Sequence, residues 1–326
     1  MKKINIGLYM GSWPQNIGNA FFDLGAYAIL KEAMPDAVIH RVGGATHWMF
    51  NASFNHLKNP IERKLRRRFN QRQTISNSIE IPMFANLDLV VFAGMSMCAE
   101  FVANNGPTFM ELAKRKIPVL LLGTGGALYD KDEPIIFSNF LKKFSDFRVI
   151  TRDDDTYKMF EPHLAGKMVA GIDCAFSLPR YLSPLSFDCP DFNVECFDEI
   201  IPPPVLNHSR QVFRAHHDMW GPLPKHYIDQ PNCLISDVPE DYLNLYANSK
   251  ITYSDRVHAC VATLAYGNEA RLFSSTPRKS LFNKLGVDNI TSTTVRLDMA
   301  NLKKLQDNQV VLAKKYIQEL VVPGAK

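Results

Sequence analysis

Several familiar signatures are missing from this sequence of 326 residues. Its six cysteines contain no C-x-x-C pair, which excludes a zinc ribbon and a thioredoxin-type motif, and we interpret them as reduced, mostly buried thiols. Neither a G-x-G-x-x-G fingerprint nor a Walker-type G-x-x-x-x-G-K-[ST] occurs. A nucleotide hydrolase is therefore excluded.

Long hydrophobic runs are also missing. No stretch approaches the roughly 20 apolar residues that cross a bilayer, and the apolar run that ends at Met10 is too short for a signal-peptide core. We therefore expect a cytoplasmic protein.

Positive charge is in modest excess over negative charge. The net charge of +4 and the pI near 8.6 fit an anionic small substrate or an anionic membrane surface, and they fall short of a nucleic-acid signature. The strongest charge run is Arg63 to Arg68, followed by Arg72. We interpret this run either as a solvated helix face or as a peripheral contact with anionic headgroups at the inner face of a membrane; RNA binding is a distant third.

Length and pattern indicate an α/β protein with two lobes, because 326 residues exceed the size at which one core keeps growing. Strand-like and helix-like segments alternate, which predicts parallel βαβ units. The predicted strands are residues 4–10, 87–92, 119–122 and 148–151, and the predicted helices begin after residue 19 and cover 107–116 and 134–144.

Regularity stops between residues 173 and 239, a Pro-rich stretch that we interpret as the passage between lobes. Order returns with a helix over 239–247, a strand over 250–253, a helix after His258, a strand over 271–273 and a helix that ends near 285. We predict an N-terminal lobe of residues 1–185, a second lobe of residues 186–300, and a C-terminal amphipathic helix, 301–326, that packs back on the lobes.

Ligands of open parallel sheets bind beyond the carboxyl ends of the strands, so candidate residues are sought in those loops. Asn16 and Gly18 precede a helix whose N–H groups could face an anion, the alternative being a plain glycine turn. Gly94 and the loop Gly123 to Gly126, with Gly125, let a ligand or a neighbouring loop approach the backbone.

The segment from Ser254 to Ala259 combines a permanent cation, Arg256, with a titratable imidazole, His258, at a strand-to-helix junction. This combination is typical of an anion site with a proton donor beside it, although an isolated Arg-x-His is more often structural.

These blocks together carry a resemblance. The chain is similar to the polysaccharide pyruvyl transferase family in the order of its motifs. The motifs are Asn16-x-Gly18, Gly94, Gly123 to Gly126, Thr151-Arg152-Asp153, Asp173-Cys174-Ala175-Phe176 and Ser254-Asp255-Arg256-Val257-His258-Ala259. Singly each is weak, but in this order they are fairly specific.

The resemblance implies a GT-B-like fold of two Rossmann-like lobes facing a cleft, the second lobe being short. It also implies an enzyme of surface or exopolysaccharide biosynthesis that transfers a pyruvyl group from phosphoenolpyruvate to a saccharide, lipid-linked or free, as a ketal. In that family Arg-x-His supplies cation and acid, which by motif are Arg256 and His258 here, and the arginine matching Arg152 helps hold the donor. No cofactor or metal is implied.

Further candidates follow from the same comparison. Asp173 could orient a sugar hydroxyl, accept its proton or cap a turn, and Arg278 and Lys279 lie near where the family often has a lysine. Phosphoenolpyruvate carries a carboxylate and a phosphate that guanidinium groups bind well.

Two rival functions stay open, one from the shared two-lobed architecture and one because Asn19, Cys174 and the short second lobe depart from the family's usual pattern. One is a GT-B-like glycosyltransferase that uses a nucleotide sugar, and the other is a non-catalytic saccharide-binding protein. His216-His217-Asp218 with nearby Trp220 could suggest a metal or sugar site, but the ligand spacing does not match a metal site, so we expect these histidines in the cleft or a surface loop.

Overall fold

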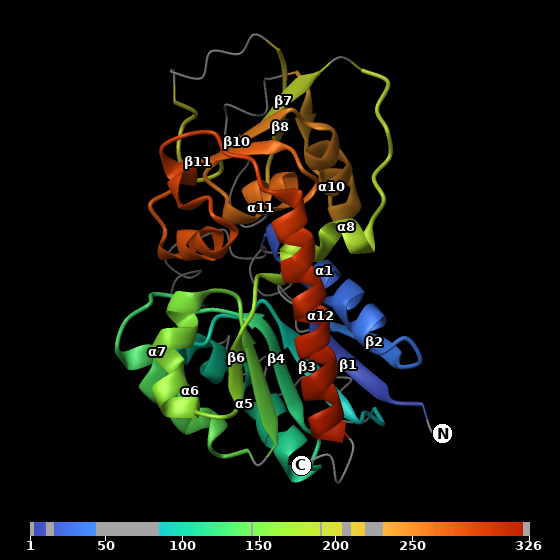
Figure 1. Cartoon of the computed structure of the whole chain (residues 1–326), viewed down its shortest axis with the longest axis vertical. Helices are drawn as coiled ribbons and strands as arrows, with labels where there is room; N and C mark the ends of the chain where they lie inside the picture. Colours follow the sequence, from blue (N-terminus) through green and yellow to red (C-terminus); the bar gives the residue numbers. More distant parts are fainter. Residues whose placement is uncertain are drawn as a thin grey trace, which may run out of the picture.

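A computed structural model describes residues 3–10, 16–43, 85–144, 146–189, 191–203, 210–218 and 231–321. Within these ranges the chain forms two parallel sheets, which lie one above the other in Figure 1, and a long C-terminal helix passes along both. The basic run at residues 63–72 and Trp220 lie outside the described residues.

Six described strands form the first sheet, in the order β2-β1-β3-β4-β5-β6, and every neighbouring pair is parallel. The strands are β1 (Asn5–Met10), β2 (Val38–Gly43), β3 (Leu89–Ala93), β4 (Val119–Thr124), β5 (Phe147–Thr151) and β6 (Met168–Ala170). The order reverses between β1 and β3, and such a switch point opens a crevice at the carboxyl ends of the strands.

Helices cover both faces of this sheet, which explains why its strands read as continuous apolar runs. In β3, Leu89 and Val91 pack on one face, toward α1 (Gly18–Ala33) and α12 (Met299–Val321). Val90 and Phe92 pack on the other face, in a phenylalanine-rich layer. The helices on that side are α5 (Ala99–Lys114), α6 (Asp132–Leu141) and α7 (Asp154–Leu164).

The second sheet has five described strands in the order β11-β10-β7-β8-β9, again all parallel. Its strands are β7 (Phe192–Cys196), β8 (Gln211–Ala215), β9 (Cys233–Leu234), β10 (Ile251–Ser254) and β11 (Glu269–Leu272). The helices and turns around it are η2 (Cys174–Ser177), α8 (Leu178–Tyr181), α10 (Pro239–Asn248), α11 (Val257–Ala265), η3 (Pro277–Leu285) and η4 (Asp288–Thr291).

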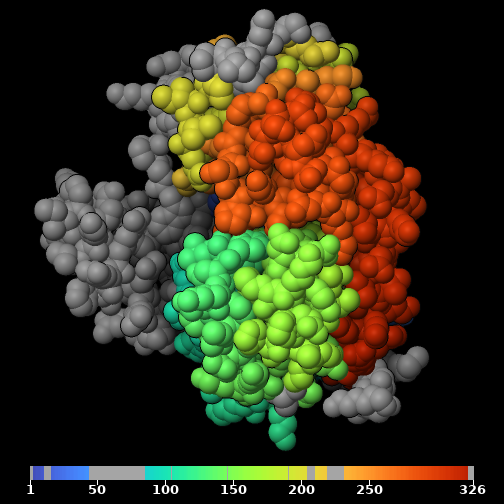
Figure 2. Space-filling model, turned by 60° about the vertical axis from the view of Figure 1, so that its left-hand side comes forward, coloured from blue at the N-terminus to red at the C-terminus, as the bar shows by residue number. Residues whose placement is uncertain are grey.

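The two lobes share one hydrophobic core. Leu8 and Leu122 of the first sheet belong to the same buried cluster as Val194 of the second sheet, and helix α1 contacts α10, α11 and α12. Figure 2 shows the second lobe, in orange, seated on the green first lobe along a seam. Residues on the two sides of this seam are therefore held in a fixed relation.

Most predicted elements are confirmed, including the end of the first helix before Pro35. Two predictions were wrong. The helix predicted over 107–116 begins earlier: it is α5, which starts at Ala99 and contains Pro107 in its interior. The stretch over 173–239, interpreted as a passage between lobes, contains the strands β7, β8 and β9. The predicted lobe boundary at 185 falls in the passage between α8 and β7.

All six cysteines are free thiols, and three of them, Cys174, Cys196 and Cys260, are buried. In the part of the chain that the structure describes, no helix is both long and apolar enough to span a membrane.

Candidate active site

The Ser254 to His258 segment forms the turn from β10 into α11. The hydroxyl of Ser254 donates to the Cys196 carbonyl at 2.7 Å and accepts the N–H of Arg256 at 2.8 Å. Arg256 is the last extended residue before the helix, which places His258 in the first turn of α11. The two motif side chains therefore leave the turn from different positions and reach different partners.

Arg256 is surrounded by carboxylates. Its Nε lies 2.7 Å from Asp198 Oδ2, its Nη1 lies 2.9 Å from Glu199 Oε1, and its Nη2 lies 3.6 Å from Asp218 Oδ2. Burial raises the pKa of Asp198, but His216, His217 and Arg256 outweigh it and bring this pKa down to about 2. Three negative charges thus surround the one positive charge of Arg256.

Asp255 holds the loop that supplies two of these carboxylates. Its carboxylate accepts the backbone N–H groups of Asp198, Glu199 and Ile200 at 3.1, 2.7 and 3.0 Å. The motif therefore holds the loop after β7 in two ways. The Asp255 carboxylate binds backbone N–H groups of the loop, and the Arg256 guanidinium binds its carboxylate side chains.

His258 faces the first lobe. Its Nε2 lies 3.5 Å from Oδ2 of the fully buried Asp173, and its ring packs edge-on against Phe22 at a centroid distance of 5.4 Å. Burial raises the pKa of Asp173, but contact with His258, the charge of Arg152 and the Ala175 N–H outweigh it, so this pKa is lowered. Asp173 is thus an ionised carboxylate that faces the imidazole of His258.

Arg152 is buried beside this pair. Its Nη2 donates to the Gly126 carbonyl at 3.0 Å and contacts the Tyr129 hydroxyl at 3.3 Å. Burial lowers the pKa of Arg152, but Tyr129 and Asp173 more than compensate and raise it. A Cβ on Gly125 would lie 2.0 Å from Arg152 Nε, so glycine here makes room for the guanidinium.

Polar atoms without hydrogen bonds gather in this region. Arg152 Nε, Asp173 Oδ2 and His258 Nε2 are buried and form no hydrogen bond within the described residues. Their nearest charged partners lie slightly farther away, at 3.5 Å between Asp173 Oδ2 and His258 Nε2 and at 3.6 Å between Arg152 Nε and Asp153 Oδ2. Buried polar atoms of this kind are uncommon in native proteins, and a catalytic role is one reason for which they are retained.

Arg278 adds a second cation near this group. The side chain is exposed, and among the described residues no carboxylate forms an ion pair with it. Partial desolvation by the surrounding protein and then repulsion from Arg152 lower the pKa of Arg278 even though the residue reaches solvent, while Tyr129 and Asp173 oppose this. Lys279 is also exposed, and its backbone N–H donates to the Thr276 carbonyl at 3.2 Å.

Three first-lobe predictions need correction. The N–H of Gly18 donates to Asn16 Oδ1 at 2.8 Å and the N–H of Ile17 donates to the His217 carbonyl at 3.0 Å, so these N–H groups do not face an anion. At Gly94, φ is +60° and a Cβ would lie 2.2 Å from the Phe22 ring. This glycine makes room for a side chain, and that side chain supports His258.

His216 and His217 are both buried and therefore do not lie in a surface loop. His216 Nδ1 lies 2.7 Å from Asp198 Oδ1, and His217 Nε2 lies 2.6 Å from the Tyr246 hydroxyl. The described ranges contain no group of three or more ligand-type side chains placed to hold a metal ion.

Sequence reasoning missed Asp198 and Tyr129. Asp198 follows β7, and recognition of that strand would have marked the residue as lying at a carboxyl end. The sequence contains no pattern that marks Tyr129. Its hydroxyl reaches Asp153 and Arg152 because Tyr129 itself adopts a left-handed backbone conformation, with φ of 59°.

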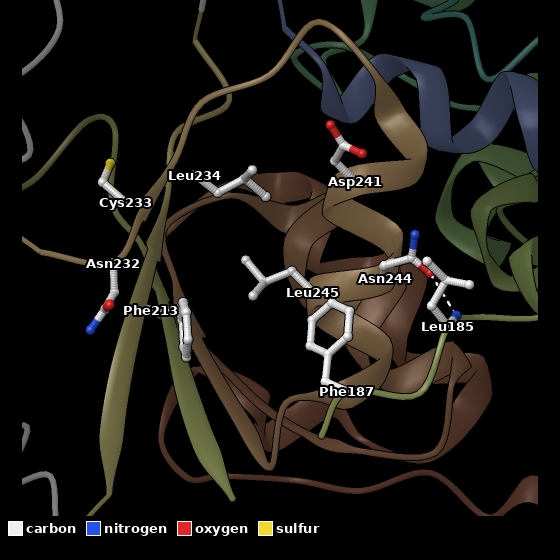
Figure 3. A pocket seen from close by; sticks show the side chains of 9 residues that line it. All are labelled: Leu185, Phe187, Phe213, Asn232, Cys233, Leu234, Asp241, Asn244 and Leu245. Carbon is white, nitrogen blue, oxygen red and sulfur yellow. Dashed lines mark hydrogen bonds between the residues drawn. The ribbon is translucent and has the colours of Figure 1, made fainter. Parts of the chain in front are cut away.

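Two pockets lie away from these residues. The pocket of about 390 Å³ in Figure 3 lies between β8, β9 and α10, where Phe187, Phe213 and Leu245 surround it. Another, of about 430 Å³, lies beside α12. Neither includes a residue predicted for the site.

The fold and the position of these residues define a GT-B-like α/β protein. Similar solved structures include a putative UDP-N-acetylglucosamine 2-epimerase from Listeria monocytogenes (11% identity, TM-score 0.52, covering 98% of this chain and 91% of that one). The chain is similar to the same extent to a UDP-N-acetylglucosamine 2-epimerase (13% identity, TM-score 0.51, covering 98% of this chain and 91% of that one). It is also similar to the UDP-N-acetylglucosamine 2-epimerase from Rickettsia bellii (12% identity, TM-score 0.50, covering 98% of this chain and 99% of that one). At such identities the likeness concerns the fold alone.

The family follows from the sequence. The polysaccharide pyruvyl transferase model matches residues 16–275, so the chain belongs to the polysaccharide pyruvyl transferase family. A search among curated proteins finds no matching sequence.

Proposed function

We propose that the protein transfers a pyruvyl group from phosphoenolpyruvate to two hydroxyls of a saccharide, forming a ketal. One observation carries the proposal: an ionised carboxylate, Asp173, faces the imidazole of His258 where the lobes meet, within electrostatic range of Arg152 and Arg278. Family membership supports a transferase of this kind.

The two guanidiniums supply what the donor needs. Arg152 and Arg278 repel each other, and a carboxylate or phosphate between them would relieve that repulsion. Arg256 is already surrounded by three carboxylates, so we assign donor binding to Arg152 and Arg278 and give Arg256 the role of holding the loop at Asp198.

In the reaction, protonated His258 gives its proton to the methylene carbon of phosphoenolpyruvate, and Asp173 stabilises the imidazolium before transfer. A saccharide hydroxyl adds to C2, the C2–O bond to phosphate breaks, and a second hydroxyl closes the ketal. Of the two hydroxyl protons released, one restores His258 and the other leaves with phosphate. A positioned acid of this type contributes a factor of about 10² to 10⁴.

The test measures phosphate released from phosphoenolpyruvate with a panel of saccharides, free and lipid-linked. We expect His258→Gln to lower kcat by about 10² to 10⁴ with little change in KM for the donor. The matched control is His163→Gln, an exposed histidine on α7, with unchanged rates. Equal release by wild type and His258→Gln would remove His258 from the acid role.

Thermal protection separates the rivals. Protection by phosphoenolpyruvate supports the proposal. Protection by UDP alone favours a nucleotide-sugar glycosyltransferase; UDP is the probe because the similar solved structures are named as UDP-N-acetylglucosamine 2-epimerases. Protection by saccharides alone, without phosphate release, favours the non-catalytic saccharide-binding protein.

A further inference from the structure

The segment that carries Asp173 is an irregular stretch between β6 and α8. The N–H of Gly171 still reaches the Thr151 carbonyl at 3.0 Å, but no strand continues beside Ile172. Buried backbone N–H and C=O groups need partners, and here a side chain supplies them.

That side chain is Gln309 of α12. Its Nε2 donates to the Ile172 carbonyl at 3.0 Å, and its Oε1 accepts the Ile172 N–H at 3.1 Å. The amide thus pairs with Ile172 as a neighbouring strand would. A Cβ on Gly171 would lie 2.2 Å from Gln309 Oε1, so this approach requires glycine.

Gln306, one turn earlier on α12, holds the other end of the segment. Its Nε2 donates to the Phe176 carbonyl at 2.6 Å, and its Oε1 accepts from Arg180 Nε at 3.2 Å. Both glutamines are buried. Asp173 therefore lies between two points that one helix fixes, and Figure 1 shows this helix passing along both lobes.

We propose that Gln309 is a positioning residue for the Asp173–His258 pair. The Ile172 carbonyl belongs to the same rigid peptide plane as the N–H of Asp173, so holding that carbonyl sets the direction in which the Asp173 side chain leaves the backbone. The Ala175 N–H then fixes Oδ1 at 2.9 Å, which leaves Oδ2 directed at His258. The catalytic meaning of this placement rests on the proposed function; the placement itself does not.

The variant is Gln309→Met, which keeps the length of the side chain and removes both hydrogen bonds. The matched control is Glu319→Gln on the same helix, which breaks the pair between Glu319 Oε2 and Arg148 Nε, 2.9 Å apart, without touching the Asp173 segment. Asp173→Asn is the positive control.

The first readout does not depend on activity. In protein with ¹⁵N-labelled histidine, we expect the Nε2 signal of His258 to move in Gln309→Met in the same direction as in Asp173→Asn, and to stay in place in Glu319→Gln. Amide exchange of the peptide around Ile172 should quicken in Gln309→Met alone. A His258 signal that stays in place in Gln309→Met overturns the inference.

The second readout is the rate of phosphate release. A displacement of the reacting groups by about 1 Å costs about 100-fold, so kcat of Gln309→Met should fall by about 10- to 100-fold while KM for phosphoenolpyruvate changes less than about twofold. A normal kcat overturns the positioning role. If wild type releases no phosphate, the proposed function fails, and the histidine signal alone then decides whether Gln309 places Asp173.

Discussion

Arg256 and Arg278 carry the same guanidinium in opposite surroundings. Arg256 is enclosed by Asp198, Glu199 and Asp218, whereas Arg278 is exposed and feels the like charge of Arg152. Removing one partner of a buried ion pair leaves an uncompensated charge, while removing an unpaired surface cation does not. The first arginine should therefore matter for folding and the second for the donor.

At the residue scale, we expect Arg278→Gln to raise KM for phosphoenolpyruvate about tenfold or more without lowering Tm, because one charge-assisted contact is lost. Arg256→Gln should instead lower the free energy of unfolding by about 1 to 3 kcal/mol, because the covered Asp198 carboxylate loses its guanidinium partner but keeps His216 and the N–H groups of His217 and Asp218. Donor kinetics and urea denaturation check this, with exposed Lys315→Gln as the control. A donor KM that rises only in Arg256→Gln would contradict it.

At the scale of single elements, loops after strands make room for site residues by lacking side chains. Gly94 accommodates the ring of Phe22, and Gly125 accommodates the guanidinium of Arg152. Each glycine determines where a neighbouring side chain lies.

We expect Gly125→Ala to lower the free energy of unfolding by about 1 to 3 kcal/mol, because the new methyl group would overlap a buried guanidinium. Phosphate release should fall with it. The control is Gly106→Ala within α5, where nothing lies within 4 Å of the added Cβ and alanine favours the helix by about 1 kcal/mol. Equal stability of the two variants in urea would refute this account of Gly125.

At the scale of the whole molecule, buried charge near the seam makes stability depend on pH. The pKa of His217 is lowered to about 3, mainly by burial. Asp198 acts to raise this pKa, whereas Arg256 and His258 act to lower it further. The unfolded chain therefore binds a proton below pH of about 6.5 that the folded chain refuses until about 3. Over that range stability falls as pH falls.

For Asp198 the lowered pKa gives stability that is present above pH of about 4 and lost as pH falls toward 2, about 2 kcal/mol in all. For His217 the slope between pH 6.5 and 3 is about 1.4 kcal/mol per pH unit. We expect His217→Gln to flatten this slope and His163→Gln, on the surface, to leave it. Urea denaturation at pH 7.5, 6 and 5 is the measurement; identical slopes for wild type and His217→Gln would sink this explanation.

The sequence by itself determined the parallel α/β character and the family, and it named Asp173 and His258 as separate candidates; that they face each other is seen only in the structure. Apolar periodicity is local, and motif order survives without coordinates, so both can be read from the chain. The strand β7, FNVEC, alternates apolar and polar residues and could have been recognised, whereas β9 has only two residues, carries no periodicity and is defined by its pairing with β8 in the folded sheet.

Only the tertiary structure decided which charged side chains are paired with an opposite charge and which are not. It neutralised Arg256 with carboxylates from two other loops, left Arg278 unpaired among the described residues, and brought Gln309 of the last helix to Ile172, a separation of 137 residues. Electrostatic and hydrogen-bond partners depend on distances of a few ångströms between segments far apart in sequence, and those distances exist only in the folded chain.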